Sequence, residues 1–497
     1  MDPVAIAFAV YSLAIVAVGL FASRWTRAES EDYFLGGRTL GPFLSALSSG
    51  ASGSSAWVTM GLVGLAVATG LRAYWLIPGV VIGIAFNWFV LARRMRSRAA
   101  DLSAVTIPDL LSMHYGEGRG GRLPVVRLMS VLVILSAMFL YVSAQMAAAG
   151  QMFEYVFPGM SYRAGVAIGV LIVLAYTVVG GFRAACWTDM VQSSIMLLAI
   201  VAMPAVVLGA GAGGGDVLGT LRSEDPGLAT FWPTGTVFAV SGFLLGSGAL
   251  GVNLGYPGQP HVLVRLMALK DARIVNQGAA VQLTWTVLIY GGAITTGVLV
   301  KAAAIGGAGW AAAIDKSTQE LSMILAASEL LPGVLSAFVL AAMISAMAST
   351  ADSQLVVAAS VVSSDAYDRL IAHGARRLTP WLNRLAVLAL GIGAGALVLD
   401  QRVRIYEYVL MYGWAILGAS FGPQIALALL WQRSTRAGCI AGMASGFITA
   451  IAWKVLDDRQ DIELPGYNLT VAFTVSLVAN VLISVLTPQR PGPAQNE

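Results

Sequence analysis

Long apolar stretches, separated by short polar segments, run through almost the whole chain. A helix needs about 20 predominantly apolar residues to cross the hydrocarbon core of a bilayer, so each stretch predicts one transmembrane helix. About thirteen such stretches can be placed along the sequence. They cover residues 4–23, 42–69, 73–92, 124–153, 162–182, 187–211, 235–257, 275–300, 333–362, 384–400, 405–431, 437–456 and 467–487. The pattern predicts an all-α polytopic membrane protein.

Two of these stretches are interrupted. The second has no large apolar side chain between Ser48 and Ala56. The seventh contains Gly242, Gly246, Gly248, Gly251, Gly255, Pro257, Gly258 and Pro260. Gly and Pro weaken the helical hydrogen-bond ladder, so both stretches can unwind and expose backbone carbonyls. Two interrupted spans in corresponding positions indicate an inverted-repeat transporter; the alternative is that small residues only allow helices to pack closely.

The spacing of the two interruptions predicts a single transmembrane domain, residues 1–497, built around two repeats of five helices. The first helix and its loop occupy residues 1–41, the two repeats occupy 42–211 and 235–431, and two peripheral helices occupy 437–487. Most of the 30 Lys and Arg residues, Arg265 among them, fall in loops that this arrangement places inside. By the positive-inside rule, the N-terminus is expected outside and the C-terminus inside.

Composition narrows the class of protein further. The chain is 57% hydrophobic and 11% charged, whereas soluble proteins carry about 25% charged residues. No basic segment precedes the first apolar stretch, so that stretch is interpreted as an uncleaved helix rather than a signal peptide. Cys186 and Cys439 are far apart and the three histidines lack ligand spacing, which argues against a disulfide framework and against a zinc or haem site. The basic run 93–98 is interpreted as a solvated face, so no nucleic-acid partner is expected.

Polar residues inside the ninth stretch indicate a cation site. The segment Ser349-Thr350-Ala351-Asp352-Ser353 lies within an apolar run, and polar or ionisable groups at membrane depth are costly and usually functional. Hydroxyl and carboxylate oxygens are ligands that suit a hard cation. Ala346 shares a helix face with Ser349 and Thr350 at spacings of three and four residues. The alternative is that the two hydroxyls hydrogen-bond back to their own helix.

Short motifs in a fixed order resemble the sodium:solute symporter family, and most closely its bacterial sodium/proline symporters. The motifs are Asp32–Arg38, Leu40-Gly41-Pro42, Trp57, Met60-Gly61, Gly180-Gly181-Phe182, Trp187-Thr188-Asp189, Gln192, Leu254-Gly255-Tyr256, Gly258-Gln259-Pro260-His261, Arg265, Ser349-Thr350, Gln354-Leu355, Trp414, Gly418 and Phe421-Gly422-Pro423. The resemblance implies a LeuT-type 5+5 inverted repeat, with one extra helix before it and two after. It also implies sodium-coupled symport, by alternating access, of a small organic solute such as proline into the cytoplasm.

The resemblance also implies two ion sites. Sodium would be held by backbone and hydroxyl oxygens of Ala51, Ser54, Ala346, Ser349 and Thr350. A second cation or proton site would comprise Asp189, Ser349, Asp352 and Ser353. An alternative for Asp189 is an N-cap of the helix predicted at 187–211, where an acid suits the helix dipole. Asp352 lies in the middle of a predicted helix, where a cap is excluded.

Substrate contacts are expected at the two interrupted helices and at the aromatic side chains near them. The candidates are Ser52, Ser55, Trp57, Tyr141, Val252, Asn253, Tyr256 and Trp414. The chain departs from the proline symporters at two positions: Gly53 replaces an acid associated with sodium, and Val252, followed by Asn253, replaces a tryptophan. These departures leave the sodium stoichiometry and the identity of the solute open.

The resulting interpretation is a symporter rather than an enzyme, with sodium as its coupling ion. Proton-coupled or mixed-ion symport of a different solute, an ion-permeable channel and a non-transporting solute sensor remain as alternatives. The expected partners are a small zwitterionic solute and membrane lipid, and the protein is expected to function as a monomer. The expected location is the bacterial cytoplasmic (inner) membrane.

Overall fold

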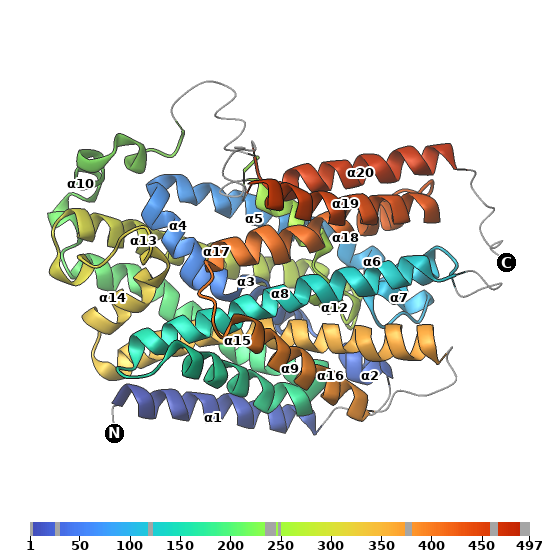
Figure 1. The fold of residues 1–497 in the computed structure, drawn as a ribbon, viewed down its shortest axis with the longest axis horizontal. Coiled ribbons are helices and arrows are strands. Elements are labelled where there is room, and N and C mark those ends of the chain that lie inside the picture. Colours follow the sequence, from blue (N-terminus) through green and yellow to red (C-terminus); the bar gives the residue numbers. More distant parts are fainter. Residues whose placement is uncertain are drawn as a thin grey trace.

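Helices lie side by side and run lengthwise through the molecule (Figure 1). The computed structural model describes residues 3–24, 30–117, 123–233, 245–246, 250–372, 380–457 and 466–487. Within these residues there is no strand, and the only β-type pairing is an isolated bridge between Leu40 and Leu269. The predicted all-α architecture is confirmed.

The long α-helices follow the apolar stretches, and shorter α-helices lie between them. They are α1 (Pro3–Ser23), α2 (Ser30–Leu35), α3 (Pro42–Ala56), α4 (Leu62–Thr69), α5 (Leu76–Ala85), α6 (Arg93–Asp101), α7 (Ile107–His114), α8 (Val125–Val156), α9 (Tyr162–Gly209), α10 (Val217–Glu224), α12 (Pro260–Met267), α13 (Val275–Ile305), α14 (Ser322–Leu330), α15 (Gly333–Ser360), α16 (Pro380–Val398), α17 (Ile405–Glu407), α18 (Ala415–Leu430), α19 (Arg436–Asp457) and α20 (Asn468–Leu486).

Shorter 3₁₀ and π segments connect or extend these helices. They are η1 (Gly36–Arg38), η2 (Trp57–Gly61), η3 (Gly70–Trp75), η4 (Phe86–Ala92), η5 (Ala212–Gly215), η6 (Pro226–Ala229), η7 (Leu250–Gly258), η8 (Ala272–Ile274), η9 (Gly309–Ala311), η10 (Gln319–Leu321), η11 (Val361–Ile371) and η12 (Tyr408–Trp414). Several of them lie inside predicted transmembrane stretches, where they mark departures from a regular α-helix.

Ten helical segments of the described chain are long and apolar enough to cross a membrane. Two of them, of 60 and 48 residues, are too long for one crossing, since about 20 residues suffice. The first is broken at Gly70 and the second at Gly181, both with φ of 61°. Each can therefore supply two crossings. The predicted seventh stretch lies partly outside the described residues, so the total of thirteen stays a prediction.

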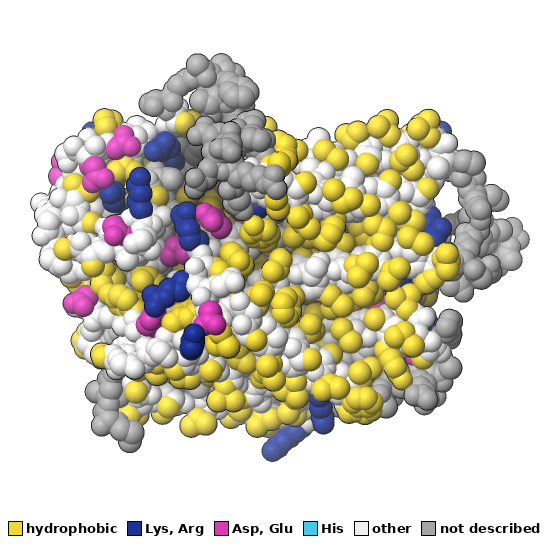
Figure 2. Space-filling view, viewed as in Figure 1, with side chains coloured by type: hydrophobic (Ala, Val, Ile, Leu, Met, Phe, Trp, Pro, Cys, Tyr) yellow, Lys and Arg dark blue, Asp and Glu magenta, His cyan; other side chains and the backbone are white. Residues whose placement is uncertain are grey.

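The outer surface is suited to lipid. On the face drawn in Figure 2, apolar side chains cover the middle of the bundle, and most charged side chains gather at the end that carries α10 and α14. Large apolar side chains such as Leu13, Leu171 and Leu198 are 70%, 68% and 65% exposed. Such exposure over a wide surface is a signature of membrane contact. α1 begins and α20 ends at opposite ends of the bundle (Figure 1), as an odd number of crossings requires.

The first predicted interruption is a true break in the helix. Ser55 has φ of 43° and ψ of −176°, and the chain continues beyond it as the π segment η2. Small residues also serve packing here, because a Cβ added at Gly50 would lie 2.9 Å from Trp285 of α13. A Cβ at Gly53 would meet only Val262 at 3.7 Å, an ordinary contact. The segment is therefore broken at Ser55 and closely packed at Gly50, so the unwinding and the packing interpretations each hold for one part of it.

The second interruption is an extended irregular segment. Residues 250–258 form η7, a run of 3₁₀ turns instead of an α-helix. η7 lies directly against η12 and α18, because a Cβ added at Gly255 would fall 1.8 Å from the Trp414 indole nitrogen and one at Gly258 2.5 Å from the Leu417 carbonyl. Gly242 and Gly248, part of the same predicted interruption, lie outside the described residues.

Candidate functional site

A cage of oxygen atoms forms where α15 crosses the broken helix α3. The Ser349 hydroxyl lies 3.4 Å from the Ala51 carbonyl oxygen and 3.3 Å from that of Ala346. The Thr350 hydroxyl lies 3.5 Å from the Ala51 carbonyl and donates a 3.0 Å hydrogen bond to the Ser52 carbonyl. Ser349 and Thr350 are both fully buried. Both hydroxyls thus face the neighbouring helix, and only Ser349 also approaches a carbonyl of its own helix.

The spacing of these oxygens fits a cation better than it fits direct hydrogen bonds. Hydroxyl hydrogen bonds to oxygen are commonest near 2.7–2.8 Å, and three of the four separations around Ser349 and Thr350 are 3.3–3.5 Å. Sodium is about the size of calcium, whose ligand oxygens lie about 2.4 Å from the ion. Two ligand oxygens at adjacent corners of an octahedron around such an ion are therefore about 3.4 Å apart. The cage has no charged side chain among these oxygens, which suits a monovalent ion that must also be released.

Ser54, the fifth predicted sodium ligand, can contribute only its backbone. Its hydroxyl donates a 2.8 Å hydrogen bond to the Gly50 carbonyl, within its own helix. Its carbonyl oxygen accepts the N–H of Trp57. The sequence interpretation requires only this carbonyl oxygen. Unlike the Ala51 carbonyl, it already accepts a backbone N–H at the break in α3.

A second polar cluster lies one turn further along α3 and α15. One oxygen of the Asp189 carboxylate accepts hydrogen bonds from Ser48 (2.6 Å), Ser52 (3.2 Å) and Arg265 (3.1 Å). The same Arg265 nitrogen lies 2.5 Å from the Ser353 hydroxyl, which in turn lies 2.9 Å from that of Ser52. Ser52, a predicted substrate contact, therefore has its side chain in this cluster.

Arg265 is an internal ion-pair partner and not a surface residue. Its Nε donates to the Ser48 hydroxyl at 3.0 Å, Nη1 donates to the His261 carbonyl, and the guanidinium lies 5.2 Å from the centre of the Phe182 ring. Its side chain is 1% exposed. Its assignment to the basic cytoplasmic loops is wrong, because α12 turns it inward toward Asp189. A buried pair of this kind leaves a costly unpaired charge if either partner is removed.

Asp189 and Asp352 are two buried acids that share one nearby positive charge, that of Arg265. Asp189 lies well inside α9, so the alternative that it caps a helix is wrong. Asp352 is fully buried and interacts electrostatically with Asp189. One Asp352 oxygen accepts the Ser353 hydroxyl at 3.1 Å, and the Tyr176 hydroxyl also lies within hydrogen-bonding reach of this carboxyl group. A buried acid needs a partner charge or a proton, and Ser349, which points into the oxygen cage, supplies neither.

Aromatic side chains surround the break in α3. The Trp57 and Tyr290 rings meet edge to face at 5.7 Å, and those of Tyr256 and Trp414 do so at 4.8 Å. The Tyr256 and Tyr290 hydroxyls are 3.4 Å apart. These four side chains are at most 3% exposed. Sequence reasoning missed Tyr290, whose only signal is an aromatic residue beside two glycines, a pattern that equally fits packing.

The other predicted substrate residues contribute differently. The Tyr141 hydroxyl lies 3.5 Å from that of Ser55, at the break itself. The Val252 carbonyl accepts the Trp414 indole N–H at 3.1 Å, so the backbone of Val252 positions an aromatic wall. The Asn253 side chain donates to the Leu250 carbonyl within η7. The structure thus brings Tyr141 and Ser55 together, and it turns the Asn253 amide back onto its own segment.

Three side-chain amides hold the irregular segments in place, and the sequence interpretation named none of them as a site residue. The Gln145 carbonyl of α8 accepts the Ala56 N–H at 2.8 Å, just beyond the break. The Asn87 amide donates to the Tyr256 carbonyl at 2.9 Å. The Gln259 amide donates to the Gly255 and Trp414 carbonyls at 3.2 and 3.1 Å. The sequence signal for these residues is a polar side chain within an apolar helix. Their partners lie in other segments, so the sequence alone does not identify them.

Glu320 closes a contact between η10 and the start of α17, near the end of the bundle that carries α10 and α14. Its two carboxylate oxygens accept the N–H groups of Ile405 and Tyr406, each at 2.9 Å, where α17 begins. Its backbone lies against α4, because a Cβ added at Gly64 would fall 3.1 Å from Glu320 Cα. Burial raises the pKa of Glu320, an effect that these two N–H groups and Arg404 partly offset.

Acid is expected to strengthen this closure. Because burial raises the pKa of Glu320, the closed form binds a proton more tightly than an open form with an exposed carboxyl, whose pKa is about 4.3. Closure should therefore be favoured as the pH falls through that interval and weakened above it. Hydrogen–deuterium exchange at the Ile405 and Tyr406 amides, corrected for intrinsic rates, measures this. Glu320→Gln should abolish the pH effect, and Glu224→Gln, whose carboxylate pairs with Lys301, should preserve it; protection that decreases on acidification would contradict the prediction.

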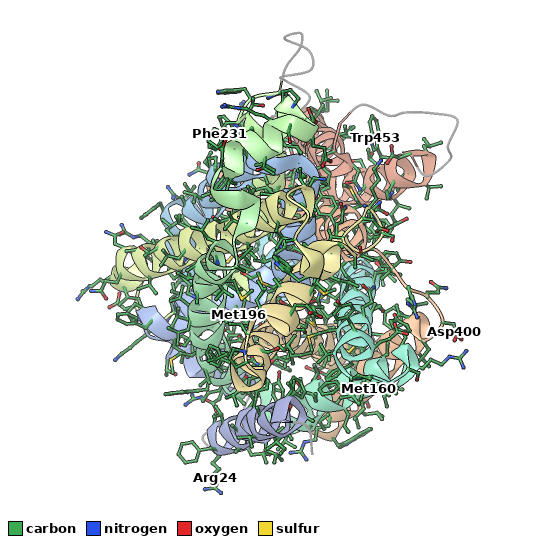
Figure 3. The ribbon with its side chains drawn as sticks, turned by 90° about the vertical axis from the view of Figure 1, so that its left-hand side faces the viewer. Arg24, Met160, Met196, Phe231, Asp400 and Trp453 are labelled. Carbon is green, nitrogen blue, oxygen red and sulfur yellow. The ribbon has the colours of Figure 1, made fainter. Side chains whose placement is uncertain are left out.

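Known structures show the same fold. The chain is similar over 98% of its length to a Na⁺-coupled sialic acid symporter in a substrate-bound, outward-open state, with 98% of that chain covered, a TM-score of 0.77 and 17% identity. It is also similar to a nucleobase-cation-symport-1 family transporter in a closed conformation, over 91% of this chain and 92% of that one, with a TM-score of 0.53 and 13% identity. These likenesses confirm the LeuT-type fold. Figure 3, which looks along the bundle, shows α1 at its outer edge and Met196 of α9 near its centre.

Sequence relatives cover nearly the whole chain. The high-affinity proline transporter PutP of Bacillus subtilis is 34% identical over 485 residues, which is 97% of each chain. The sodium/proline symporter of Escherichia coli is 32% identical over 488 residues, covering 97% of this chain and 93% of the relative. The model of the sodium:solute symporter family matches residues 33–446. The chain, a multi-pass membrane protein with a buried oxygen cage at its broken helix α3, therefore belongs to the sodium:solute symporter family.

Proposed function

We propose that this protein couples the inward movement of sodium to the symport of a small zwitterionic solute, proline or a similar amino acid, by alternating access. The observation that carries the proposal is the oxygen cage of Ala51, Ala346, Ser349 and Thr350, whose 3.3–3.5 Å separations suit sodium. Membership of the family supports sodium-coupled symport. Relatives named as proline transporters support the choice of solute.

Sodium would couple to the solute through α3. The cage joins α3 to α15, so an ion between them draws the two helices together. The break at Ser55 lies four residues beyond Ala51 and leads directly to Trp57, at the aromatic cluster. Ion binding therefore positions one wall of the solute pocket, and solute binding in turn holds α3 in the position that the ion requires. Linkage demands that each ligand raise the affinity for the other.

The proposed solute pocket lies between the break in α3 and η7. Trp57, Tyr256, Tyr290 and Trp414 supply apolar walls, and backbone groups freed at the two breaks supply polar contacts for a carboxylate and an ammonium group. The side chains around it are buried, so the described conformation is closed around this region. A compact solute with few rotatable bonds suits such a pocket because little conformational entropy is lost on binding.

The proposal includes a second ion-linked residue, Asp352. Its full burial beside a second acid, Asp189, favours either a second sodium ion or proton coupling as the next candidate. A Cβ at Gly53 would make only an ordinary contact with Val262, so close packing of the backbone does not account for the absence of the acid that the proline symporters carry there. The carboxyl group of Asp352 would supply the acidic group that is missing at Gly53.

The proposal places the protein in a bacterial cytoplasmic membrane with its N-terminus outside and its C-terminus inside, functioning as a monomer in contact with lipid. The apolar flank of the bundle supports contact with lipid. The predicted excess of basic residues in inside loops supports the orientation.

Uptake by purified protein in proteoliposomes tests the proposal. Radiolabelled proline should accumulate under an inward sodium gradient and not under an equal potassium gradient. A proton gradient imposed without sodium distinguishes proton coupling. Sodium and proline should also stabilise the purified protein against heat. Each ligand should lower the concentration of the other that gives half-maximal stabilisation. Stabilisation by proline that is equal in sodium and in potassium would overturn sodium coupling, and stabilisation by sodium but not proline would redirect the search to other amino acids.

A further inference from the structure

A groove between α1 and α9 opens on the outer surface of the bundle. Its volume is about 440 Å³, within the range of about 300–1,000 Å³ that is common for small-ligand pockets. The side chains that line it are all hydrophobic, among them Ala17, Val18 and Phe21 on α1 and Trp187 and Met190 on α9. Because α1 lies at the outer edge of the bundle (Figure 3) and the protein is a multi-pass membrane protein, the groove faces the bilayer.

The two helices pack closely beside the groove. A Cβ added at Gly19 would fall 2.9 Å from Tyr176 Cβ and 3.5 Å from Thr188 Cγ2, so the α1 backbone lies directly on α9 there. Phe21 and Trp187, which line the groove, are instead 54% and 37% exposed. Protein interiors contain few voids larger than a water molecule, and the bilayer core holds almost no water. An apolar groove of this size at a membrane-facing helix seam is therefore suited to hydrocarbon.

A positive charge lies at the end of the groove. Arg24 follows directly after the last residue of α1, its side chain is exposed, and its guanidinium carbon lies 5.9 Å from the centre of the Phe21 ring. Figure 3 shows Arg24 at the outer edge of the bundle, beside α1. Tryptophan and basic side chains are typical of the level at which hydrocarbon meets lipid headgroups. The groove thus combines an apolar lining, which includes Trp187, with a cation at one end.

The helices that form the groove offer no acid for Arg24 to pair with. α1 contains no Asp or Glu, and Asp189, which lies among the groove-lining residues of α9 in sequence, is fully buried and paired with Arg265. A second copy of the protein, docked symmetrically through this face, would present the same apolar residues and another arginine. A phosphate group pairs well with arginine, so a molecule with a hydrocarbon chain and a phosphate matches the groove better than a second copy does.

We propose that the groove between α1 and α9 binds an anionic phospholipid, with one acyl chain along Ala17, Val18 and Met190 and the headgroup phosphate at Arg24. The apolar lining binds the chain whatever the headgroup, because burial of hydrocarbon is not directional. Arg24 supplies the preference for a negatively charged headgroup. The inference does not depend on which ion or solute the protein transports, and it gives α1 a function as one wall of a lipid site.

The bound lipid would support the helix turns that carry the buried ion pair. On α9, Trp187, Met190 and Val191 line the groove, whereas Asp189 between them is fully buried and faces Arg265. A chain packed against the outer side of these turns holds α9 and α1 together. Because such a lipid binds the folded protein and not the unfolded chain, it should raise the stability of the protein.

Thermal unfolding of the purified, delipidated full-length protein tests the headgroup preference. Phosphatidylglycerol should stabilise it at about fivefold lower concentration than phosphatidylcholine with the same chains, which corresponds to about 1 kcal/mol. Arg24→Gln should remove this difference. Arg94→Gln, which changes an exposed arginine of α6 that donates to the Val90 carbonyl, is the matched control and should preserve it. Glycerol 3-phosphate, which has the phosphate but no chains, should not stabilise the protein.

Filling the groove tests where the chain binds. Ala17→Trp should abolish stabilisation by both lipids, whereas Ala9→Trp, at another exposed position about two turns away on α1, should preserve it. Phosphatidylglycerol with a photoreactive group on one chain should label residues 187–191 of the unmodified protein, a result that requires no variant to fold. Even labelling of all lipid-facing helices, or equal lipid responses of the two tryptophan variants, would overturn the inference. A dimer that Ala17→Trp dissociates would also overturn it, by assigning the groove to a second copy.

Discussion

Thr350→Val is expected to abolish sodium-driven uptake at ordinary sodium concentrations without disrupting the fold. Valine has nearly the shape of threonine but lacks the hydroxyl that lies 3.0 Å from the Ser52 carbonyl and 3.5 Å from that of Ala51. The cage would lose one ligand and the α3 carbonyls would lose a buried partner, at a cost of about 1–3 kcal/mol. The sodium concentration for half-maximal proline uptake should therefore rise roughly 10- to 100-fold.

A buried threonine with no role in the cage provides the control. The Thr296 hydroxyl of α13 donates to the Gly292 carbonyl of its own helix at 2.8 Å and is equally inaccessible. Thr296→Val should leave the sodium dependence of uptake unchanged and alter only the thermal midpoint slightly. If Thr350→Val and Thr296→Val retain the same sodium dependence, the cage at Ala51 is not the coupling site.

Arg265→Met should cause the largest loss of stability of any single change considered. Methionine fills much of the space but removes the charge that pairs with Asp189 at 3.1 Å and the contacts with Ser48 and Ser353. An unpaired carboxylate would remain in the middle of the bundle, and breaking a buried ion pair typically costs about 3–5 kcal/mol. The thermal unfolding midpoint of the purified protein, recorded in one detergent, measures the loss.

Two further variants identify the cause of that loss. Arg265→Met combined with Asp189→Asn removes both charges and should recover much of the lost stability, since no unpaired ion remains. Arg163→Met breaks an ion pair with Asp400 whose side chains are 72% and 70% exposed, and it should change the midpoint little. A combined variant that is as unstable as Arg265→Met alone would show that packing, and not the unpaired charge, accounts for the effect.

Several elements of the fold followed from the chain pattern. Apolar stretches of membrane-spanning length predict helices because a bilayer leaves the backbone few other ways to satisfy its hydrogen bonds. The break near Ser55 and the irregular η7 followed from runs of small residues, Gly and Pro. The division into two repeats and the total of thirteen crossings stay predictions, since part of the seventh stretch lies outside the described residues.

The sodium cage could be anticipated in part because its α15 atoms are local. Ala346, Ser349 and Thr350 share one face of a helix by spacing alone, so their mutual proximity needs no knowledge of other helices. Their partner on α3, the Ala51 carbonyl, came from the family resemblance, and the structure brings it within 3.5 Å of both hydroxyls. Which oxygens bind an ion stays a proposal, and the cage geometry supports it.

The sequence by itself therefore determined the class of protein, its helices, their breaks and the residues that share a helix face, because these depend on hydrophobicity and on the local period of the chain. Only the tertiary structure decided that Arg265 points inward to Asp189, that Tyr290 joins the aromatic cluster and that Gln145 holds the break in α3. The physical reason is that the partner of a polar side chain in an apolar bundle is set by how separate helices rotate and pack against one another. A loop position near basic residues and a buried ion pair look alike in sequence, and burial alone distinguishes them.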